Sequence, residues 1–273
     1  MENIELIFLG TGTSTGIPIL GCHCNVCKST NKKNNRLRTS IFINYKNKYH
    51  FIVDTGPDLR TQLLRENIER CDFAIITHDH SDHLNGIDDL RPFTFLPKRH
   101  PLPVFSHLTH HNNIEKKFDY IFKRDQIFNA RNPYLGGGLP LLNLHSIDEI
   151  TQFFPDIFID PILLPHGSGK TMGLLINNQL GYLIDCHEIP GESVAKLNKA
   201  NLDCLIIDCL QLNDHPSHLT VEKAFNYIEK IAPKKAYLTH MNHDLDHEVL
   251  QNMANQRFKF PVFVAFDQLK IKV

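Results

Sequence analysis

Hydrophobic and polar residues alternate in short segments along most of the chain, and this pattern predicts β-strands separated by amphipathic helices. Strands are expected over the apolar or alternating runs at residues 4–9, 40–45, 48–53, 72–77, 180–185, 202–207 and 235–239. Only Lys46 and Asn47 separate the second and third runs, which is the length of a tight hairpin turn. The pattern therefore predicts a mixed α/β fold with antiparallel hairpins near its start.

Local signals also predict where several helices begin and end. Pro57 suits the first position of a helix that reaches about Asn67, and a second helix is expected to start near Leu84. Thr220 is expected to cap a third helix, which Pro233 ends. The apolar residues of that helix recur at helical spacing, at Val221, Ala224, Phe225, Ile228 and Ile231. Alternation of this kind predicts stacked sheets with helices outside them.

The chain contains no segment that resembles a linker between domains, so we predict a single domain over residues 1–273. The polar stretch at residues 29–38 and the glycines at 136–138 are expected to be surface loops. The start, Met1-Glu2-Asn3, lacks the basic residues of a secretory signal, and no apolar run approaches the roughly 20 residues that span a bilayer. A cytoplasmic protein without membrane contact is expected.

The composition directs attention to metal chemistry. Among 273 residues, 29 Lys and Arg balance 30 Asp and Glu, and the net charge of −1 argues against a protein that binds a nucleic-acid polymer through a broad basic surface. The chain is rich in histidine, with 17 residues, and it has 7 cysteines. In a reducing compartment these cysteines are not expected to form a disulfide framework.

A dense cluster of metal-binding residue types follows the predicted strand at 72–77. It is His78-Asp79-His80-Ser81-Asp82-His83, the pattern His-x-His-x-Asp-His. Imidazole and carboxylate groups bind Zn, Mn or Fe, and one turn can direct four of them at two neighbouring ions. A solvated helix entrance would account for one such residue, but four within six positions favour a metal site.

One loop cannot complete two coordination spheres, so further ligands are expected at other strand ends. His166, Asp185 and His240 each follow an apolar run in this way. Taken singly, each could equally be a loop residue whose hydrogen bonds are satisfied nearby.

Together these residues resemble the metallo-β-lactamase-fold hydrolases, and the resemblance covers nearly the whole chain. It implies the α/β class and the metallo-β-lactamase αβ/βα four-layer sandwich, with a dinuclear site for two divalent ions, Zn or Mn, at the edge of the sheets. It implies that one ion is held by His78, His80 and His166, the other by Asp82, His83 and His240, and that Asp185 bridges both. Asp54 matches a family residue that orients the histidine loop through hydrogen bonds. Supporting or structural roles are expected for Asp79, His187 and Asp208.

A second candidate metal site lies near the start of the chain. Cys22, Cys24 and Cys27 place three thiolates within six residues, a spacing that suits a tetrahedral structural Zn. The fourth ligand is expected to be His243, with His23 as the competitor, and a buried or reactive cysteine cluster is the alternative. A closed four-ligand site would position an early loop beside the catalytic centre.

The opening of the chain narrows the resemblance. The run Leu9-Gly10-Thr11-Gly12-Thr13-Ser14-Thr15-Gly16-Ile17-Pro18 and the cysteine motif are similar to the phosphoribosyl 1,2-cyclic phosphate phosphodiesterases, the PhnP family. Ser217-His218-Leu219-Thr220 and Thr239-His240-Met241-Asn242-His243 are similar as well. The resemblance implies that His218 assists catalysis and that three cysteines with His243 hold an extra structural zinc. A purely structural histidine at a helix entrance is the alternative for His218.

We therefore expect a phosphodiesterase with two metal ions. Its phosphodiester substrate is expected to be a small cyclic sugar phosphate or nucleotide phosphate. A hydroxide between the ions would attack phosphorus, and His218 would protonate the departing oxygen as a general acid. Arg36, Arg38 and Lys170 are candidates for binding a second phosphate.

Two other functions fit the same residues. One is a metal-dependent ester, lactone or thioester hydrolase, because one fold supports several chemistries. The other is a non-catalytic carrier like the pyrroloquinoline-quinone synthesis protein B, which shares the opening pattern. A tRNA 3′-processing nuclease fits the charge balance poorly. The resemblance also suggests a homodimer.

Overall fold

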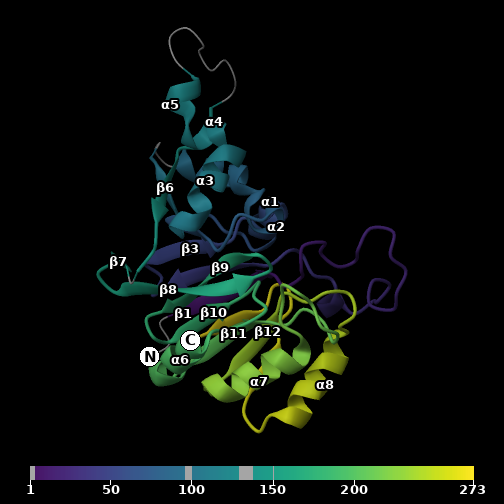
Figure 1. Ribbon diagram of the computed structural model, residues 1–273. Helices are drawn as coiled ribbons and strands as arrows, with labels where there is room; N and C mark the ends of the chain where they lie inside the picture. Colours follow the sequence, from purple (N-terminus) through teal and green to yellow (C-terminus); the bar gives the residue numbers. More distant parts are fainter. Residues whose placement is uncertain (1–3, 96–99, 129–137, 150) are drawn as a thin grey trace.

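Two seven-stranded β-sheets lie face to face in the computed structural model, which describes residues 4–95, 100–128, 138–149 and 151–273 (Figure 1). The two ends of the described chain meet, because the N–H of Ile4 donates to the carbonyl of Val273. Residues 1–3 at the start of the chain, and Gly136 and Gly137 of the expected glycine loop, lie outside the described residues.

The first sheet combines the strands β1 to β6 with the final strand of the chain. Its spatial order is β14 (Lys270–Lys272), β1 (Ile4–Gly10), β2 (Ser40–Tyr45), β3 (Tyr49–Val53), β4 (Phe73–Ile76), β5 (Leu102–Ser106) and β6 (Leu142–Ser146). The strands from β14 to β3 pair antiparallel, and those from β3 to β6 pair parallel.

The second sheet is built from the second half of the chain. Its order is β13 (Val262–Val264), β12 (Ala236–Thr239), β11 (Cys204–Asp208), β10 (Leu180–Leu183), β9 (Gly169–Ile176), β8 (Ile157–His166) and β7 (Thr151–Phe154). Strands β7 to β10 pair antiparallel, whereas β10 to β13 pair parallel.

Helices lie outside both sheets. On the side of the first sheet these are α1 (Leu59–Arg65), α2 (Ser81–Leu84), the 3-10 helix η2 (Ile87–Thr94), α3 (Leu108–Lys117), α4 (Asp119–Phe122) and α5 (Arg124–Ile127). On the side of the second sheet these are α6 (Gly191–Ala200), α7 (Val221–Ile231) and α8 (His247–Arg257), and the loop between β1 and β2 holds the 3-10 helix η1 (Lys32–Asn34).

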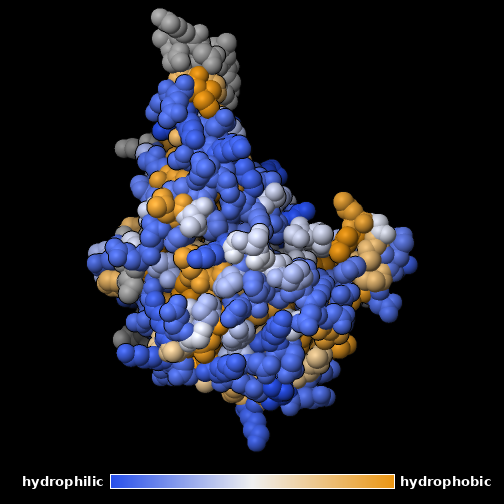
Figure 2. Space-filling model, in the orientation of Figure 1, coloured by the Kyte–Doolittle hydropathy of each residue, from blue (hydrophilic) through white to orange (hydrophobic). Residues whose placement is uncertain are grey.

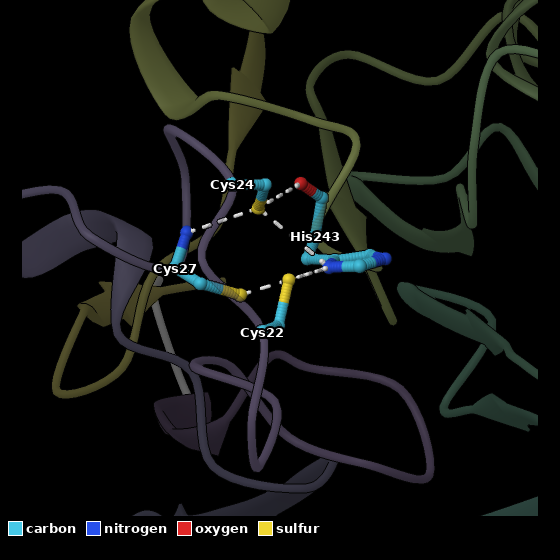
Figure 3. Close-up of side chains that lie close together, drawn as sticks. All are labelled: Cys22, Cys24, Cys27 and His243. Atoms are coloured by element: carbon cyan, nitrogen blue, oxygen red, sulfur yellow. Dashed lines mark hydrogen bonds between the residues drawn. The ribbon is translucent and has the colours of Figure 1, made fainter.

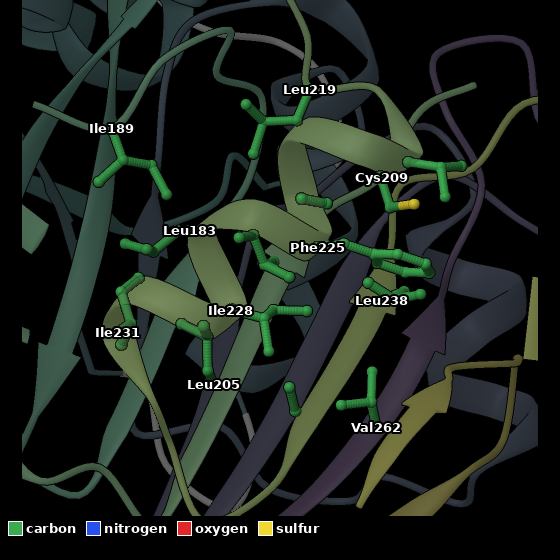
Figure 4. Close-up of a cluster of buried hydrophobic side chains, with 14 of the residues drawn as sticks. Leu183, Ile189, Leu205, Cys209, Leu219, Phe225, Ile228, Ile231, Leu238 and Val262 are labelled. Atoms are coloured by element: carbon green, nitrogen blue, oxygen red, sulfur yellow. The ribbon is translucent and has the colours of Figure 1, made fainter. Parts of the chain in front are cut away.

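The alternation of side chains along each strand explains this layering. Ile41 and Ile43 of β2 pack between the sheets, whereas Phe42 between them faces the helices on the outer side. On the other side, Phe225 and Ile228 of α7 pack onto the second sheet (Figure 4). Each sheet is thus apolar on both faces, and the predicted four-layer α/β sandwich is confirmed.

The strand predictions are confirmed to within a few residues, and the hairpin turn adopts the expected conformation. Lys46 and Asn47 both have positive φ, of 52° and 53°, as a two-residue hairpin turn of the mirror-image type requires. Thr220 caps α7 as predicted, since its hydroxyl accepts a hydrogen bond from the N–H of Lys223.

Two helix predictions need correction. The helix expected from Pro57 begins only at Leu59, after the N-cap residue Asp58. The helix expected to begin near Leu84 instead ends there, as the single turn α2, and a 3-10 helix follows. The polar residues Ser81, Asp82 and His83 form most of the turn α2, so the pattern of apolar residues did not predict that the helix begins at Ser81.

Among the described residues, no helix has the length and apolar composition that crossing a membrane requires.

Candidate metal centre

The predicted ligand residues lie at the carboxyl ends of strands from both sheets. His78 follows β4, His166 ends β8, Asp185 follows β10 and His240 follows β12. Asp185 and His240 have positive φ, of 52° and 62°, and Asp54 after β3 has a φ of 67°. Left-handed backbone is costly for residues other than glycine and is typical of functional sites. This conformation occurs at the ends of β3, β10 and β12, where polar side chains gather around the candidate centre.

The structure brings all seven predicted residues together in two groups that share one carboxylate. The first group is His78, His80, His166 and Asp185; the second is Asp82, His83, Asp185 and His240. Within each group the candidate ligand atoms lie within 4.8 Å of one another. Asp185 faces both groups, because its Oδ2 lies 3.2 Å from Nε2 of His83 and 3.4 Å from Nε2 of His78. The partition matches the one that the resemblance implied.

The donor atoms of this cluster suit divalent ions. His240 Nε2 lies 2.9 Å from Asp185 Oδ1, but among the described residues neither atom has a hydrogen-bond partner, and Nε2 of His78 and of His83 also have none there. Leaving several buried polar atoms without partners is expensive unless another group satisfies them. Imidazole nitrogens and carboxylate oxygens grouped around common points are a good donor set for Zn, Mn or Fe. The residues therefore fit metal ions.

Hydrogen bonds behind the histidines fix which nitrogen faces the centre. Nδ1 of His83 lies 2.8 Å from Asp54, and Nδ1 of His166 donates to the carbonyl of Ser217 at 2.9 Å. Asp54 is fully buried and also accepts from the N–H and hydroxyl of Thr77. Both rings thus present Nε2, and Asp54 lies where an orienting carboxylate was expected.

Close backbone packing holds the histidine loop against β3. A Cβ on Gly56 would lie 2.0 Å from the carbonyl oxygen of Asp82, so only glycine fits there. The carbonyl of His83 accepts from the N–H of Thr55 at 2.7 Å. The segment Asp54–Gly56 therefore sets both the position of the ligand loop and the orientation of His83.

Burial and neighbouring charge give the two groups different electrostatics. Burial opposes ionisation of Asp185, but His240 and His83 overcome it and hold the pKa of this carboxyl well below its ordinary value. Burial lowers the pKa of His78 well below its ordinary value, and the neighbouring His83 adds to the effect. The carboxylate that the two groups share is therefore ionised and attracts positive charge, and His78 of the first group offers a neutral imidazole.

His218 lies beside the centre and is oriented by a buried carboxylate. Its Nδ1 lies 3.2 Å from Asp208 Oδ2, and its ring stacks on His240 with the ring centres 4.9 Å apart. The other oxygen of Asp208 lies 3.3 Å from Nδ1 of His240. Asp208 thus supports both His218 and a candidate ligand. His187, in contrast, is not among the residues gathered at the centre.

A cavity of about 580 Å³ opens on the centre from the first group of ligands. Its walls are α3 and the β8–β9 turn, and the lining residues are His78, Asp79, His80, Thr109, His110, Asn113, His166, Gly167, Ser168, Gly169, Lys170 and Ser217. Of the basic residues considered for a second phosphate, Lys170 alone is in this lining. Arg36 is instead buried and donates to the carbonyls of Asn242 and Leu245, and Arg38 pairs with Asp58 at 3.0 Å.

The second candidate site is a cluster of three thiols and one imidazole (Figure 3). Nδ1 of His243 lies 3.2 Å from Sγ of Cys22, 3.7 Å from that of Cys24 and 3.6 Å from that of Cys27. The N–H of Cys27 donates to Cys24 Sγ and lowers the pKa of the Cys24 thiol to about 7, whereas burial raises the pKa of the Cys27 thiol to about 11. His23 is exposed and is not part of this group, so the geometry favours His243 as the fourth ligand.

The cysteine loop extends from the body of the molecule and is fixed at its base. Figure 1 shows the β1–β2 loop reaching to one side, and part of its surface is hydrophobic in Figure 2. Leu20 in this loop is 99% exposed. Arg36 ties the returning arm of the loop to the segment around His243 through its bonds to Asn242 and Leu245.

The residues that α3 contributes to the cavity, Thr109, His110 and Asn113, were not found from the sequence, and His110 is the imidazole among them. His110 lies on α3, about 30 positions after the ligand loop, within a helix whose residues are mostly polar. Its Nδ1 lies 2.8 Å from Asp79, the residue between the first two ligand histidines. No spacing rule connects these positions, because the connection depends on how α3 docks on the loop.

Comparison with known proteins agrees with this geometry. The chain matches the model of the beta-lactamase superfamily domain over residues 49–241. It is 34% identical over 242 residues to a Porphyromonas gingivalis (strain ATCC BAA-308 / W83) protein named octanoyltransferase, a match that covers 88% of this chain and 46% of that protein. The chain thus spans about half the length of this curated relative.

Solved structures extend the comparison to nearly the full length. A diphosphatase from the PhnP family is 30% identical, with a TM-score of 0.84 over 99% of this chain and 98% of that chain. The Zn²⁺-bound PqqB of Methylobacterium extorquens is 15% identical and shares the fold, with a TM-score of 0.76 over 98% and 100% of the two chains. By its fold, its sequence and the residues at its strand ends, this chain belongs to the beta-lactamase superfamily.

Proposed function

We propose that this protein is a metal-dependent phosphodiesterase that hydrolyses a small cyclic sugar or nucleotide phosphate. The observation that carries the proposal is the pair of ligand-type groups that share Asp185, the first of which lines a cavity. A shared carboxylate between two donor groups is suited to two neighbouring ions. The similarity to a diphosphatase of the PhnP family supports phosphate chemistry.

In this proposal the seven clustered residues hold two ions, Zn or Mn. The donors of one ion would be His78, His80 and His166, those of the other would be Asp82, His83 and His240, and Asp185 belongs to both groups. Two such ions supply an activated water and neutralise charge on the phosphate oxygens. Asp54 keeps His83 oriented, and Ser217 does the same for His166 through its carbonyl.

His218 supplies the proton that the leaving oxygen needs. Asp208 accepts the hydrogen bond from Nδ1 of His218, so Nε2 is the nitrogen that remains for the substrate. Burial opposes the ionisation of Asp208, but His218 lowers its pKa below the ordinary value, so the carboxylate stays available as the acceptor. A general acid held in this way stabilises charge on a departing sugar oxygen.

A second function is favoured by one specific observation. The curated relative is named octanoyltransferase, and that name refers to acyl chemistry. The same metal centre could hydrolyse an acyl ester or thioester, since attack at a carbonyl also develops charge on oxygen. The chain matches less than half of that protein, however, so the name is weaker support than the match to the diphosphatase over the whole chain.

A substrate panel separates these functions. Purified protein loaded with Zn or Mn is assayed on bis-p-nitrophenyl phosphate, 2′,3′-cyclic nucleotides, a lactone and an octanoyl thioester. We expect hydrolysis of the phosphodiesters, loss of that activity with a chelator, and recovery on adding metal. Turnover of the lactone or thioester alone would establish the acyl alternative. Metal binding without turnover on any substrate would instead favour a carrier.

A further inference from the structure

His110 has a combination of features that the metal centre does not use. The residue is only 5% exposed and lines the cavity beside the candidate ligands. Its Nε2 is buried and has no hydrogen-bond partner among the described residues. A buried polar atom without a partner costs free energy, so its presence at a cavity wall points to a missing ligand group.

The other nitrogen of the ring is firmly held. Nδ1 lies 2.8 Å from Oδ1 of Asp79, and the second oxygen of that carboxylate accepts from Nδ2 of Asn113 at 2.9 Å. Lys117 donates to the backbone carbonyl of Asp79 at 2.6 Å. The three donors come from one face of α3, at helical spacing, and dock the helix on the ligand loop.

The bond to Asp79 determines whether the other ring nitrogen of His110, Nε2, donates or accepts hydrogen bonds. A carboxylate only accepts hydrogen bonds, so Nδ1 of His110 carries the hydrogen that points at Asp79. In the neutral ring Nε2 is then a lone-pair acceptor. The ring centre of His110 lies 6.5 Å from that of His78, so the acceptor is close to the reacting centre but not part of it.

We propose that Nε2 of His110 accepts a hydrogen bond from a hydroxyl group of the substrate, and that this contact selects sugar-containing ligands. The inference rests on the proposed function for the substrate class, because it assigns the cavity to the sugar part of a sugar or nucleotide phosphate. Asp79 is a positioning residue in this arrangement, since it acts on the substrate only through His110.

Two substitutions test the contact because they remove different halves of the ring's bonding. His110→Asn can keep an N–H near the position of Nδ1, and so the bond to Asp79, while it deletes the acceptor at Nε2. His110→Gln extends to the position of Nε2 but gives up the bond to Asp79. His111→Asn is the matched control, because His111 neighbours it on α3, is not in the cavity lining, and lies with Nε2 3.2 Å from the carbonyl of Ser106.

The measurement is calorimetric binding of adenosine 5′-monophosphate and its 2′-deoxy and 3′-deoxy analogues to the metal-loaded protein, with metal content checked for each variant. The wild type should bind the parent about tenfold more tightly than at least one analogue, the usual value of one such hydrogen bond. His110→Asn should lose this preference by weakening only the hydroxylated ligands, and His110→Gln should keep part of it. His111→Asn should match the wild type.

The possible results are decisive. A wild type that binds no ligand or shows no preference, an intact preference in His110→Asn, or an equal loss on all three ligands would each overturn the contact. Hydrolysis of bis-p-nitrophenyl phosphate, which has no hydroxyl, is measured in parallel. Its absence would overturn the phosphodiesterase proposal but leave a measured hydroxyl preference, and therefore this inference, standing.

Discussion

The two candidate metal sites of this chain are built in opposite ways. The His/Asp centre draws side chains from the ends of four strands in two sheets, and His78, His83, Asp185 and His240 are almost fully buried. The cysteine site draws three ligands from one six-residue segment of a projecting loop, and all four of its residues are partly exposed. One site depends on the whole fold, whereas the other is nearly local.

Their chemistry differs as much as their construction. The His/Asp centre offers nitrogen and oxygen donors, which accept several divalent metals, and a cavity reaches it. The cysteine site offers three soft sulfurs and one imidazole, a set that selects Zn and leaves no open position. This contrast favours a catalytic role for the His/Asp centre and a structural role for the cysteine site, which would hold the β1–β2 loop in place.

A short segment links the two sites. His240 and His243 are three residues apart, and Met241 between them exchanges backbone hydrogen bonds with Thr11 and Thr13 at the start of the cysteine loop. A metal at the cysteine site would therefore hold the segment next to His240 against the first sheet. Substitutions in each site should separate reaction from positioning.

The largest effect is expected when the shared carboxylate is removed. Asp185→Ala should lose metal from both groups and lose activity on every substrate, because Asp185 is the one carboxylate that the two groups share among the described residues. The loss should exceed the roughly 10²–10⁴-fold value of a general acid. Elemental analysis and rates on two phosphodiesters measure it. Asp125→Ala, at an aspartate whose side chain is 96% exposed, is the control. Full metal content in Asp185→Ala would contradict the shared role.

A smaller and selective effect is expected at His218. His218→Ala should keep its metals and lose about 10²–10⁴-fold in rate on a substrate with a sugar leaving group. The loss on bis-p-nitrophenyl phosphate should be much smaller, because p-nitrophenolate leaves without a proton. The rates on both substrates and the metal content of the variant test whether His218 acts as the general acid. An equal loss on the two substrates would make His218 a positioning residue.

The sequence predicted the centre well because its signals are local. Four ligand types occur within six residues at His78–His83, and His166, Asp185 and His240 each end an apolar run. Short apolar or alternating runs predicted strands β1 to β4 and β10 to β12, whereas β5 to β9, β13 and β14 were not predicted as strands. The resemblance to a known family supplied the grouping of the ligands, which the pattern alone left open.

The features of the site that the sequence did not predict depend on contacts between segments that are distant in the chain. Nothing in the spacing of Asp79 and His110 indicates that their side chains meet, and nothing around Arg36 shows that it is buried under the loop at Asn242. The left-handed backbone of Asp54, Asp185 and His240 could not be predicted either, because Asp and His adopt it more often than most residues but are usually found in other conformations. Such features follow from the packing of the complete fold.

The smallest effect on activity is expected at the cysteine site, although stability should change. Cys24→Ser should contain about one metal fewer per chain and melt about 5 °C or more lower, because bound metal contributes to the folding free energy. The His/Asp centre should still exchange Zn for Mn and remain active with either metal, since its ligands come from strand ends and from the segment after β4 rather than from the cysteine loop. Elemental analysis, melting temperature and rates after metal exchange measure the three effects.

His23 provides the sharpest control for this prediction, because it lies between two of the cysteines and competes with His243 for the fourth position. The exposed side chain of His23 takes no part in the cluster, whereas Nδ1 of His243 lies within 3.7 Å of all three sulfurs. His243→Ala should therefore reproduce the metal loss of Cys24→Ser, and His23→Ala should retain wild-type metal content and melting temperature. A zinc lost from His23→Ala but kept in His243→Ala would reverse the assignment. Unchanged metal in Cys24→Ser would remove the structural zinc altogether and leave the loop held only by contacts such as those of Arg36.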